Sequence, residues 1–138
     1  MSLTTEEREI IVEHRLKRAC ETLAEAKDLV NLNRWHGAAN RLYYACYYAV
    51  TALLIKNGHI SHTHNGAIGL LGKYFVVTNI IGREQNKLYQ KLFDLRQGGD
   101  YSDWINIEEE DIKPLVAPAE NFIETIEKII KNSNNILY

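Results

Sequence analysis

The sequence NRWHGAANRLYYACYYAVTALLIKNG, residues 33–58, decides the fold. It contains no proline, and it lies between two residues that suit the ends of a helix. The side chain of Asn33 can cap the first turn, and Gly58 can take the left-handed conformation past the last turn. The stretch therefore predicts one uninterrupted helix.

Apolar side chains surround the middle of this predicted helix. One side carries apolar residues at helical spacing, and tyrosines and leucines occupy the other sides; the first set is Trp35, Ala38, Leu42, Cys46, Ala49 and Leu53. A soluble helix that is apolar nearly all round lies inside a bundle. We therefore expect a central helix, with Leu42, Cys46, Ala49 and Leu53 buried among the first, fourth and last helices.

The length of 138 residues predicts one domain over residues 1–138, with a core of about residues 4–131 and a frayed C-terminal tail. Cys20 and Cys46 lie in helical patterns without the spacing of a disulfide framework. They indicate free thiols and a reducing compartment, so we expect a cytoplasmic protein. The longest nearly apolar run, residues 45–55, is too short to span a bilayer.

Charge is distributed unevenly along the chain. Between Leu29 and Arg83 there is no Asp or Glu, and this segment contains five basic residues: Arg34, Arg41, Lys56, Lys73 and Arg83. A buried central helix and its loop have little room for acids, which is one explanation. The other is a basic surface for phosphate groups.

The remaining helices are predicted from their caps and apolar periods. Thr4 and Glu7 form a capping box for a first helix that ends near Asn31, and the short turn after it predicts an antiparallel hairpin with the central helix. Thr63 or Asn65 can cap a third helix that reaches about residue 78.

A fourth helix is predicted from Arg83 to the glycine pair at residues 98–99, with a loop over residues 100–104. Asn106 and Glu109 offer a capping box for the last helix. Pro114 and Pro118 predict either a bend in that helix or a later start to its regular part. No stretch alternates with a period of two, so the fold class is all-α, an up-and-down bundle of four to five helices around the tyrosine-rich central one.

The loop before the third helix contains His59, His62 and His64. A zinc site needs three or four converging ligands, and this loop has neither a carboxylate nor a cysteine, so we predict no metal and no cofactor. Two interpretations are left: a polar loop at a helix entry, or a histidine that contributes to a phosphate or nucleotide site.

The segment Arg-Gln-Gly-Gly-Asp-Tyr, residues 96–101, is a second candidate site. The guanidinium of Arg96 can hold a phosphate through two parallel hydrogen bonds, and the glycines would let backbone donors approach it. Alternatively, Arg96 and Asp100 form an ion pair that closes the turn, with Tyr101 packed on the bundle. The tyrosine pairs at residues 43–47 and 44–48 have the spacing of a base-stacking platform, but that spacing is more typical of core and interface residues.

Three sequence motifs together resemble the HEPN domain (higher eukaryotes and prokaryotes nucleotide-binding), in its branch of small stand-alone prokaryotic proteins. They are NRLYYACYYAVTALL at residues 40–54, HTHNG at residues 62–66, and Arg96 with Asp100 and Tyr101. The resemblance covers about residues 10–131. It implies a helical bundle that dimerises, often paired in a toxin–antitoxin system with a minimal nucleotidyltransferase. The candidate nucleotide- or phosphate-binding residues are then Arg41, Tyr44, His62, His64, Arg96, Asp100 and Tyr101.

Many HEPN proteins are metal-independent ribonucleases in which a histidine follows the arginine after four to six residues. Arg96 matches that arginine, but no histidine follows it, because His64 is the last in the chain. The first interpretation is therefore a homodimeric module that binds a nucleotide, an RNA phosphate or a nucleotidyltransferase partner. The second is a ribonuclease whose acid–base group comes from His62, His64 or Tyr101 of the other subunit, and the third is an adaptor that binds only protein.

Overall fold

The computed structural model describes residues 3–101 and 106–134, and the side chains of residues 3–98 and 106–132. These residues form helices, one short π-helical turn and connecting segments, without a strand among them. The elements in chain order are α1 (Thr5–Asn31), α2 (Trp35–Lys56), α3 (His64–Leu71), η1 (Gly72–Val76), α4 (Arg83–Tyr101) and α5 (Glu109–Asn134). The predicted all-α class is confirmed.

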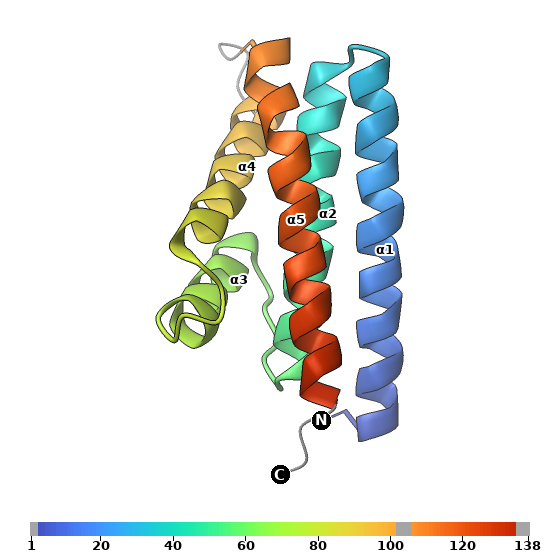
Figure 1. Ribbon diagram of the computed structural model, residues 1–138, viewed down its shortest axis with the longest axis vertical. Helices are drawn as coiled ribbons and strands as arrows, with labels where there is room; N and C mark the ends of the chain where they lie inside the picture. Colours follow the sequence, from blue (N-terminus) through green and yellow to red (C-terminus); the bar gives the residue numbers. More distant parts are fainter. Residues whose placement is uncertain (1–2, 102–105, 135–138) are drawn as a thin grey trace.

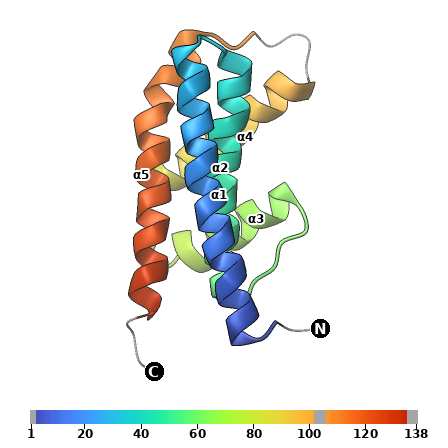
Figure 2. The same ribbon diagram turned by 90° about the vertical axis from the view of Figure 1, so that its right-hand side faces the viewer.

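The long helices α1, α2 and α5 run up and down along the long axis of the molecule, and α4 lies at an oblique angle to them (Figure 1). α1 and α2 form the predicted antiparallel hairpin, α5 lies beside both, and α4 packs on another side of α2. The short α3 and the turn η1 lie near the lower part of α4, as the second view also shows (Figure 2). Helix α2 therefore contacts α1, α3, α4 and α5.

The predicted central position of α2 is confirmed by its burial. Leu42, Cys46, Ala49 and Leu53 are all fully buried.

A stack of three aromatic rings crosses the same core from α2 to α5. Tyr43 stacks on Tyr89 of α4 with ring centroids 5.9 Å apart, and Tyr89 stacks on Phe122 of α5 at 5.6 Å. Burial of these large side chains stabilises the bundle, because apolar area is removed from water.

Helix starts follow the predicted caps at two places. The Thr4 and Glu7 capping box is formed, with the Glu7 backbone N–H donating to the Thr4 hydroxyl at 3.1 Å. Thr63 caps α3, because its hydroxyl accepts a hydrogen bond from the backbone N–H of Gly66 at 2.8 Å. Gly58 has a φ of 82°, as expected for the residue past the end of α2.

The start of α2 differs from the prediction. Asn33 does not cap it; instead Asn33 has a φ of 58°, and α2 begins at Trp35 after Arg34, which makes no side-chain cap. Asparagine tolerates the left-handed conformation, so Asn33 provides the reversal between α1 and α2. The Arg34 backbone N–H closes this turn by donating to the carbonyl of Leu29 at 2.8 Å.

The end of α4 was also predicted wrongly. The helix continues through Gly98 and Gly99 to Tyr101, so the backbone of this segment is helical where a diglycine turn and a loop were expected. A glycine inside a helix costs only about 1 kcal/mol relative to alanine, and each added residue still gains a backbone hydrogen bond.

Helix α5 begins differently from the predicted box of Asn106 and Glu109. The backbone N–H of Glu108 donates to the Asp111 carboxylate at 2.9 Å, and the Asn106 side chain instead donates to the Glu108 carboxylate at 3.2 Å. The first helical residue is Glu109, so an acceptor at Asp111, three positions after Glu108, serves the helix start better.

A later start of α5 after its prolines is not observed, because the helix includes both Pro114 and Pro118. Ile112, Leu115 and Ala119 are buried around them, and this packing offsets the hydrogen bonds that the two prolines cannot donate. Among the described residues, no helix is long and apolar enough to cross a membrane.

Candidate phosphate-binding cleft

Arg96 lies on α4 and is only 8% exposed to solvent. Its guanidinium Nη2 donates a hydrogen bond to the Tyr44 hydroxyl of α2 at 2.9 Å. The same guanidinium lies over two aromatic rings, 5.2 Å from the ring centroid of Tyr44 and 5.7 Å from that of Tyr43. A buried cation needs such partners, because desolvation would otherwise be costly. The tyrosines of α2 therefore hold the charge of Arg96 in place.

Arg41 contacts the same tyrosine from its own helix. Its guanidinium lies 5.3 Å from the Tyr44 ring centroid. Arg41 also donates to the Asn40 side-chain oxygen at 2.7 and 3.0 Å, and lies 3.7 Å from the Glu25 carboxylate of α1. Arg41, one of the five basic residues in the acid-free segment, thus contacts the same tyrosine that holds Arg96. Lys56 lines a different cavity, described below.

His64 is the first residue of α3, and its ring packs among aromatic side chains of α2. Its Nδ1 lies 2.7 Å from the Tyr43 hydroxyl, at hydrogen-bond distance. The Tyr47 ring is nearest, with centroids 4.6 Å apart, followed by Tyr43 at 5.5 Å and Tyr44 at 5.7 Å. Burial and then the positive charge of Arg96 lower the pKa of His64, so the neutral imidazole is favoured.

The N-terminal end of α3 and the C-terminal half of α4 form the two walls of an open cleft of about 450 Å³. Its lining residues are His62, Thr63, His64, Asn65, Phe93, Arg96 and Gln97. The structure therefore brings three predicted candidates, Arg96, His62 and His64, to one cavity within a single chain. Tyr44 is in contact with Arg96, and Arg41 is in contact with Tyr44, but neither is among the residues that line the cleft.

One candidate histidine lies outside the cleft, and two further candidates are not described. His59 does not line the cleft; its ring stacks on Tyr74 with centroids 4.0 Å apart. The side chains of Asp100 and Tyr101 lie outside the described residues, as does the ion pair considered between Arg96 and Asp100. Within the described part of the chain, no three metal-ligating side chains come together.

Sequence reasoning did not assign Phe93 or Tyr43 to this site. Phe93 lines the cleft, and Tyr43 makes the hydrogen bond to His64. A signal for Phe93 was present, because it precedes Arg96 by three residues and so shares a helix face with it. Tyr43 was treated as core, and it is fully buried, but its hydroxyl contacts His64, which lines the cleft.

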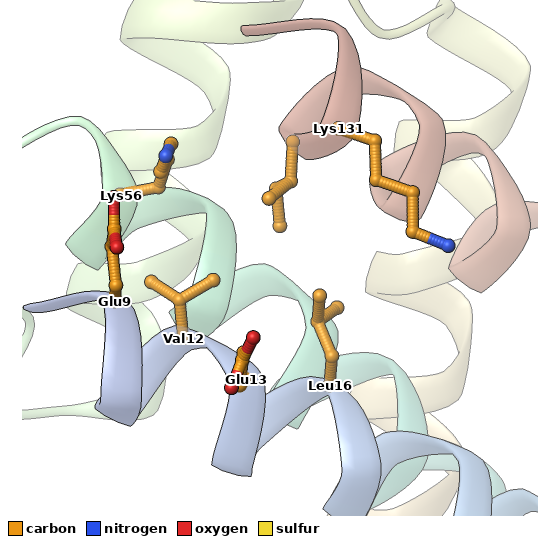
Figure 3. Close-up of a pocket in the computed structure, with 7 residues that line it drawn as sticks. Glu9, Val12, Glu13, Leu16, Lys56 and Lys131 are labelled. Carbon is orange, nitrogen blue, oxygen red and sulfur yellow. The ribbon is translucent and has the colours of Figure 1, made fainter. Parts of the chain in front are cut away.

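A second cavity, of about 310 Å³, lies between α1 and α5. Figure 3 shows Val12 and Leu16 pointing into it from α1, with Glu9 and Glu13 along the same helix. Lys131 extends along α5, away from those two carboxylates. The charged residues that line this cavity come from three helices: Glu9 and Glu13 from α1, Lys56 from α2 and Lys131 from α5.

Comparison with known proteins identifies the family. The profile described as the HEPN domain matches residues 12–129. The chain belongs to the HEPN domain family.

Relatives of this HEPN chain match it over nearly their whole length. A UPF0332 protein of Thermotoga maritima is 39% identical, with 91% of this chain and 96% of the relative covered. Two proteins of Methanocaldococcus jannaschii have names that propose them as toxins. One is 28% identical, with 90% of this chain and 90% of the relative covered. The other is 32% identical, with 80% of this chain and 82% of the relative covered.

A crystal structure of a Thermus thermophilus protein shares the fold of this HEPN chain. Its TM-score is 0.72 at 14% identity, and the alignment covers 85% of this chain and 96% of that one. At this identity the likeness concerns the fold alone. The chemistry of the HEPN chain has to be argued from its own cleft.

Proposed function

We propose that this HEPN protein binds a nucleotide or an RNA phosphate in the cleft between α3 and α4, with Arg96 as the anion-binding group. The observation that carries the proposal is the guanidinium itself, buried yet lining an open cavity and oriented by the Tyr44 hydroxyl. A planar guanidinium held in this way is suited to the fork-like recognition of phosphate oxygens.

The start of α3 adds to this electrostatic environment. The Thr63 hydroxyl accepts a hydrogen bond from the Gly66 backbone N–H. The first-turn residues His64 and Asn65 line the cleft. The N-terminal end of a helix carries a partial positive charge that favours anions. His62 is exposed beside it and can contribute a further donor. Asp100 and Tyr101 belong to the proposed site by the family resemblance.

A direct test is a fluorescence titration of the full chain with labelled single-stranded RNA and with labelled ATP, each at low and at moderate salt. We expect binding of at least one probe, weaker at higher salt because counterions screen the phosphate contacts. Absence of binding to both probes at low salt would contradict the proposal.

The assembly of this module is also a proposal. The family resemblance implies a homodimer and a nucleotidyltransferase partner, and the relatives whose names propose them as toxins support a place in a toxin–antitoxin pair. Tyr44, Tyr47 and Tyr48 are half-buried in the single chain, so aromatic surface on α2 is left for a second copy to cover.

Metal-independent RNA cleavage is a second candidate function. It is favoured by one observation, that His64 lines the same cleft as Arg96 in the same chain. A histidine supplied by the other subunit is then not needed to place an acid–base group beside the arginine.

A further inference from the structure

Exposed apolar side chains of this HEPN chain gather in one short part of it. Among the described residues, six large apolar side chains are exposed, and four of them lie between residues 60 and 80. These four, which we call the 60–80 patch, are Ile60 at 58% exposure, Tyr74 at 37%, Val77 at 77% and Ile80 at 49%. Single apolar residues are common on protein surfaces, whereas a group of them indicates a surface that another molecule covers.

Contacts within the chain join the parts of the 60–80 patch. The His59 ring, next to Ile60, stacks on the Tyr74 ring with centroids 4.0 Å apart and an angle of 16° between the planes. Tyr74 lies in η1, and π-helical turns are rare and frequently found at functional sites. The Ile80 backbone N–H donates to the Phe75 carbonyl at 2.9 Å, which folds the chain back onto η1. The patch is therefore ordered before any partner binds.

The border of the patch is basic. The Lys73 ammonium lies 5.2 Å from the Tyr74 ring centroid. Ile60 lines two small hollows, of about 50 and 90 Å³, and each of them is lined by one arginine and by no Asp or Glu. The whole patch also lies in the segment of the sequence that contains no acid. Such a surface attracts negatively charged groups.

Arg8 of α1 lines the larger hollow, whose other lining residues are Leu3, Ile55, Gly58 and Ile60. Its Nε is buried and has no hydrogen-bond partner in the part of the chain that the structure describes. A buried N–H of a charged group is unfavourable without an acceptor. The acceptor that best matches a guanidinium is a carboxylate or a phosphate. This hollow therefore suits an anionic group placed beside an apolar side chain.

Arg15 lines the second hollow, together with His59 and Ile60. Its Nη1 donates to the hydroxyl of Thr51 at 2.9 Å, and Thr51 is buried, so the guanidinium is oriented by the core. This bond uses one of the five N–H donors of an arginine, which leaves donors for a partner. Arg8 and Arg15 are seven residues apart, about two helical turns, and so lie on the same face of α1. Two acidic side chains of one segment can reach them together.

We propose that the 60–80 patch, with Arg8 and Arg15 at its border, is a docking surface for an acidic segment of a partner protein. Carboxylates of that segment meet the two arginines, and its apolar side chains cover the patch. Three of the four patch residues are aliphatic, whereas single-stranded nucleic acid binds by stacking on aromatic side chains, so a protein fits better than RNA. The surface is separate from the phosphate-binding cleft, because none of its residues lines that cleft.

The test selects binders of the full chain from a displayed library of random peptides. We expect the enriched peptides to be more negatively charged than the library and to contain apolar residues. The most enriched peptide, labelled with a fluorophore, should bind more weakly at higher salt. Arg8→Ala and Val77→Asp should each weaken its binding by about 10-fold or more, the scale of an important interface residue.

Leu32→Asp is the matched control for the added charge, because Leu32 is 67% exposed and lies at the opposite end of α1 from Arg8. It should change the affinity for the peptide by less than about threefold, as a residue outside the interface does. Melting temperatures would show that all variants are folded. The RNA titration of Val77→Asp should match that of the wild type, so a failure of this inference and a failure of the phosphate-binding cleft can be told apart.

Three results would overturn the inference. The first is the absence of enriched peptides, or enrichment of neutral or basic ones. The second is peptide binding that both Arg8→Ala and Val77→Asp leave within about threefold of the wild type. The third is binding of the wild type to vesicles of phosphatidylcholine and phosphatidylserine that Val77→Asp abolishes, with no peptide bound at the patch, which would make the patch a membrane-binding surface instead.

Discussion

The Arg96 guanidinium of α4 donates a 2.9 Å hydrogen bond to the Tyr44 hydroxyl of α2. This contact joins two helices through side chains that are 52 positions apart in the sequence. It fixes the direction in which the guanidinium faces the cleft, and it satisfies part of the hydrogen-bonding demand of a buried cation. The site is therefore built into the packing of the bundle.

Tyr44→Phe should weaken both the fold and the site. It removes the hydroxyl and keeps the ring, so the charge-assisted hydrogen bond is lost while the contact with the guanidinium remains. We expect the free energy of unfolding to fall by about 1.5 kcal/mol, the lower end for a hydrogen bond to a charged group, measured by urea denaturation. Tyr74→Phe is the control, because the Tyr74 hydroxyl makes no hydrogen bond with the described residues. Equal effects of the two variants would contradict the role given to Tyr44.

Leu53→Ala tests the central position of α2. Leu53 is fully buried, so its truncation leaves a cavity among the helices. We expect a loss of about 2–5 kcal/mol in the free energy of unfolding, measured by chemical denaturation. Val77→Ala, at a residue that is 77% exposed, should change stability by less than about 0.5 kcal/mol. A tolerated Leu53→Ala would mean that α2 is not packed as described.

The pH dependence of stability should report on His64. The folded chain lowers the pKa of His64, whereas the unfolded chain protonates it near its ordinary value of about 6.5. Protonation therefore favours the unfolded chain, so the contribution of His64 is complete above about pH 6.5 and is lost as the pH falls toward the folded pKa. Urea midpoints measured from pH 8 to pH 5 should fall more steeply for the wild type than for His64→Gln. Parallel curves would show that the fold does not perturb His64.

The assembly prediction is a two-fold symmetric dimer. Light scattering at micromolar concentration should give twice the mass of one chain. Tyr48→Glu should shift the mass toward the monomer if the half-buried tyrosines of α2 form the interface, because a charge would be buried there. A monomeric mass for the wild type would exclude a site shared between subunits, but it would leave the cleft within one chain intact.

Much of the fold could be predicted from local pattern. The apolar surface all round residues 42–53 predicted the burial of α2, because only an interior position accommodates such a helix. Predictions from helix propensity failed where the differences in propensity between residues are small. The glycine pair in α4 costs little more than 1 kcal/mol per residue, which did not end the helix.

The candidate site was predicted by residue type but not by arrangement. Arg96 and His64 were both identified as candidates, yet nothing in the sequence places them in one cleft. That placement depends on how α3 packs against α2 and α4, and this packing follows from the whole core. The hydrogen bond between Tyr43 and His64, 21 positions apart, depends on the same packing.

The affinity of Arg96 variants for single-stranded RNA tests the central claim most directly. Arg96→Ala should weaken binding by about 10- to 100-fold, corresponding to the roughly 1.5–3 kcal/mol of a hydrogen bond to a charged group. Arg96→Lys should restore it only partly, since an ammonium keeps the charge but not the planar fork. Arg83→Ala removes an exposed cation from the first turn of the same helix and serves as the control. Melting temperatures of all variants would show that they are folded. The account predicts a large loss of affinity for Arg96→Ala and a small one for Arg83→Ala; equal affinities of these two variants would contradict it and leave Arg96 as a purely structural residue.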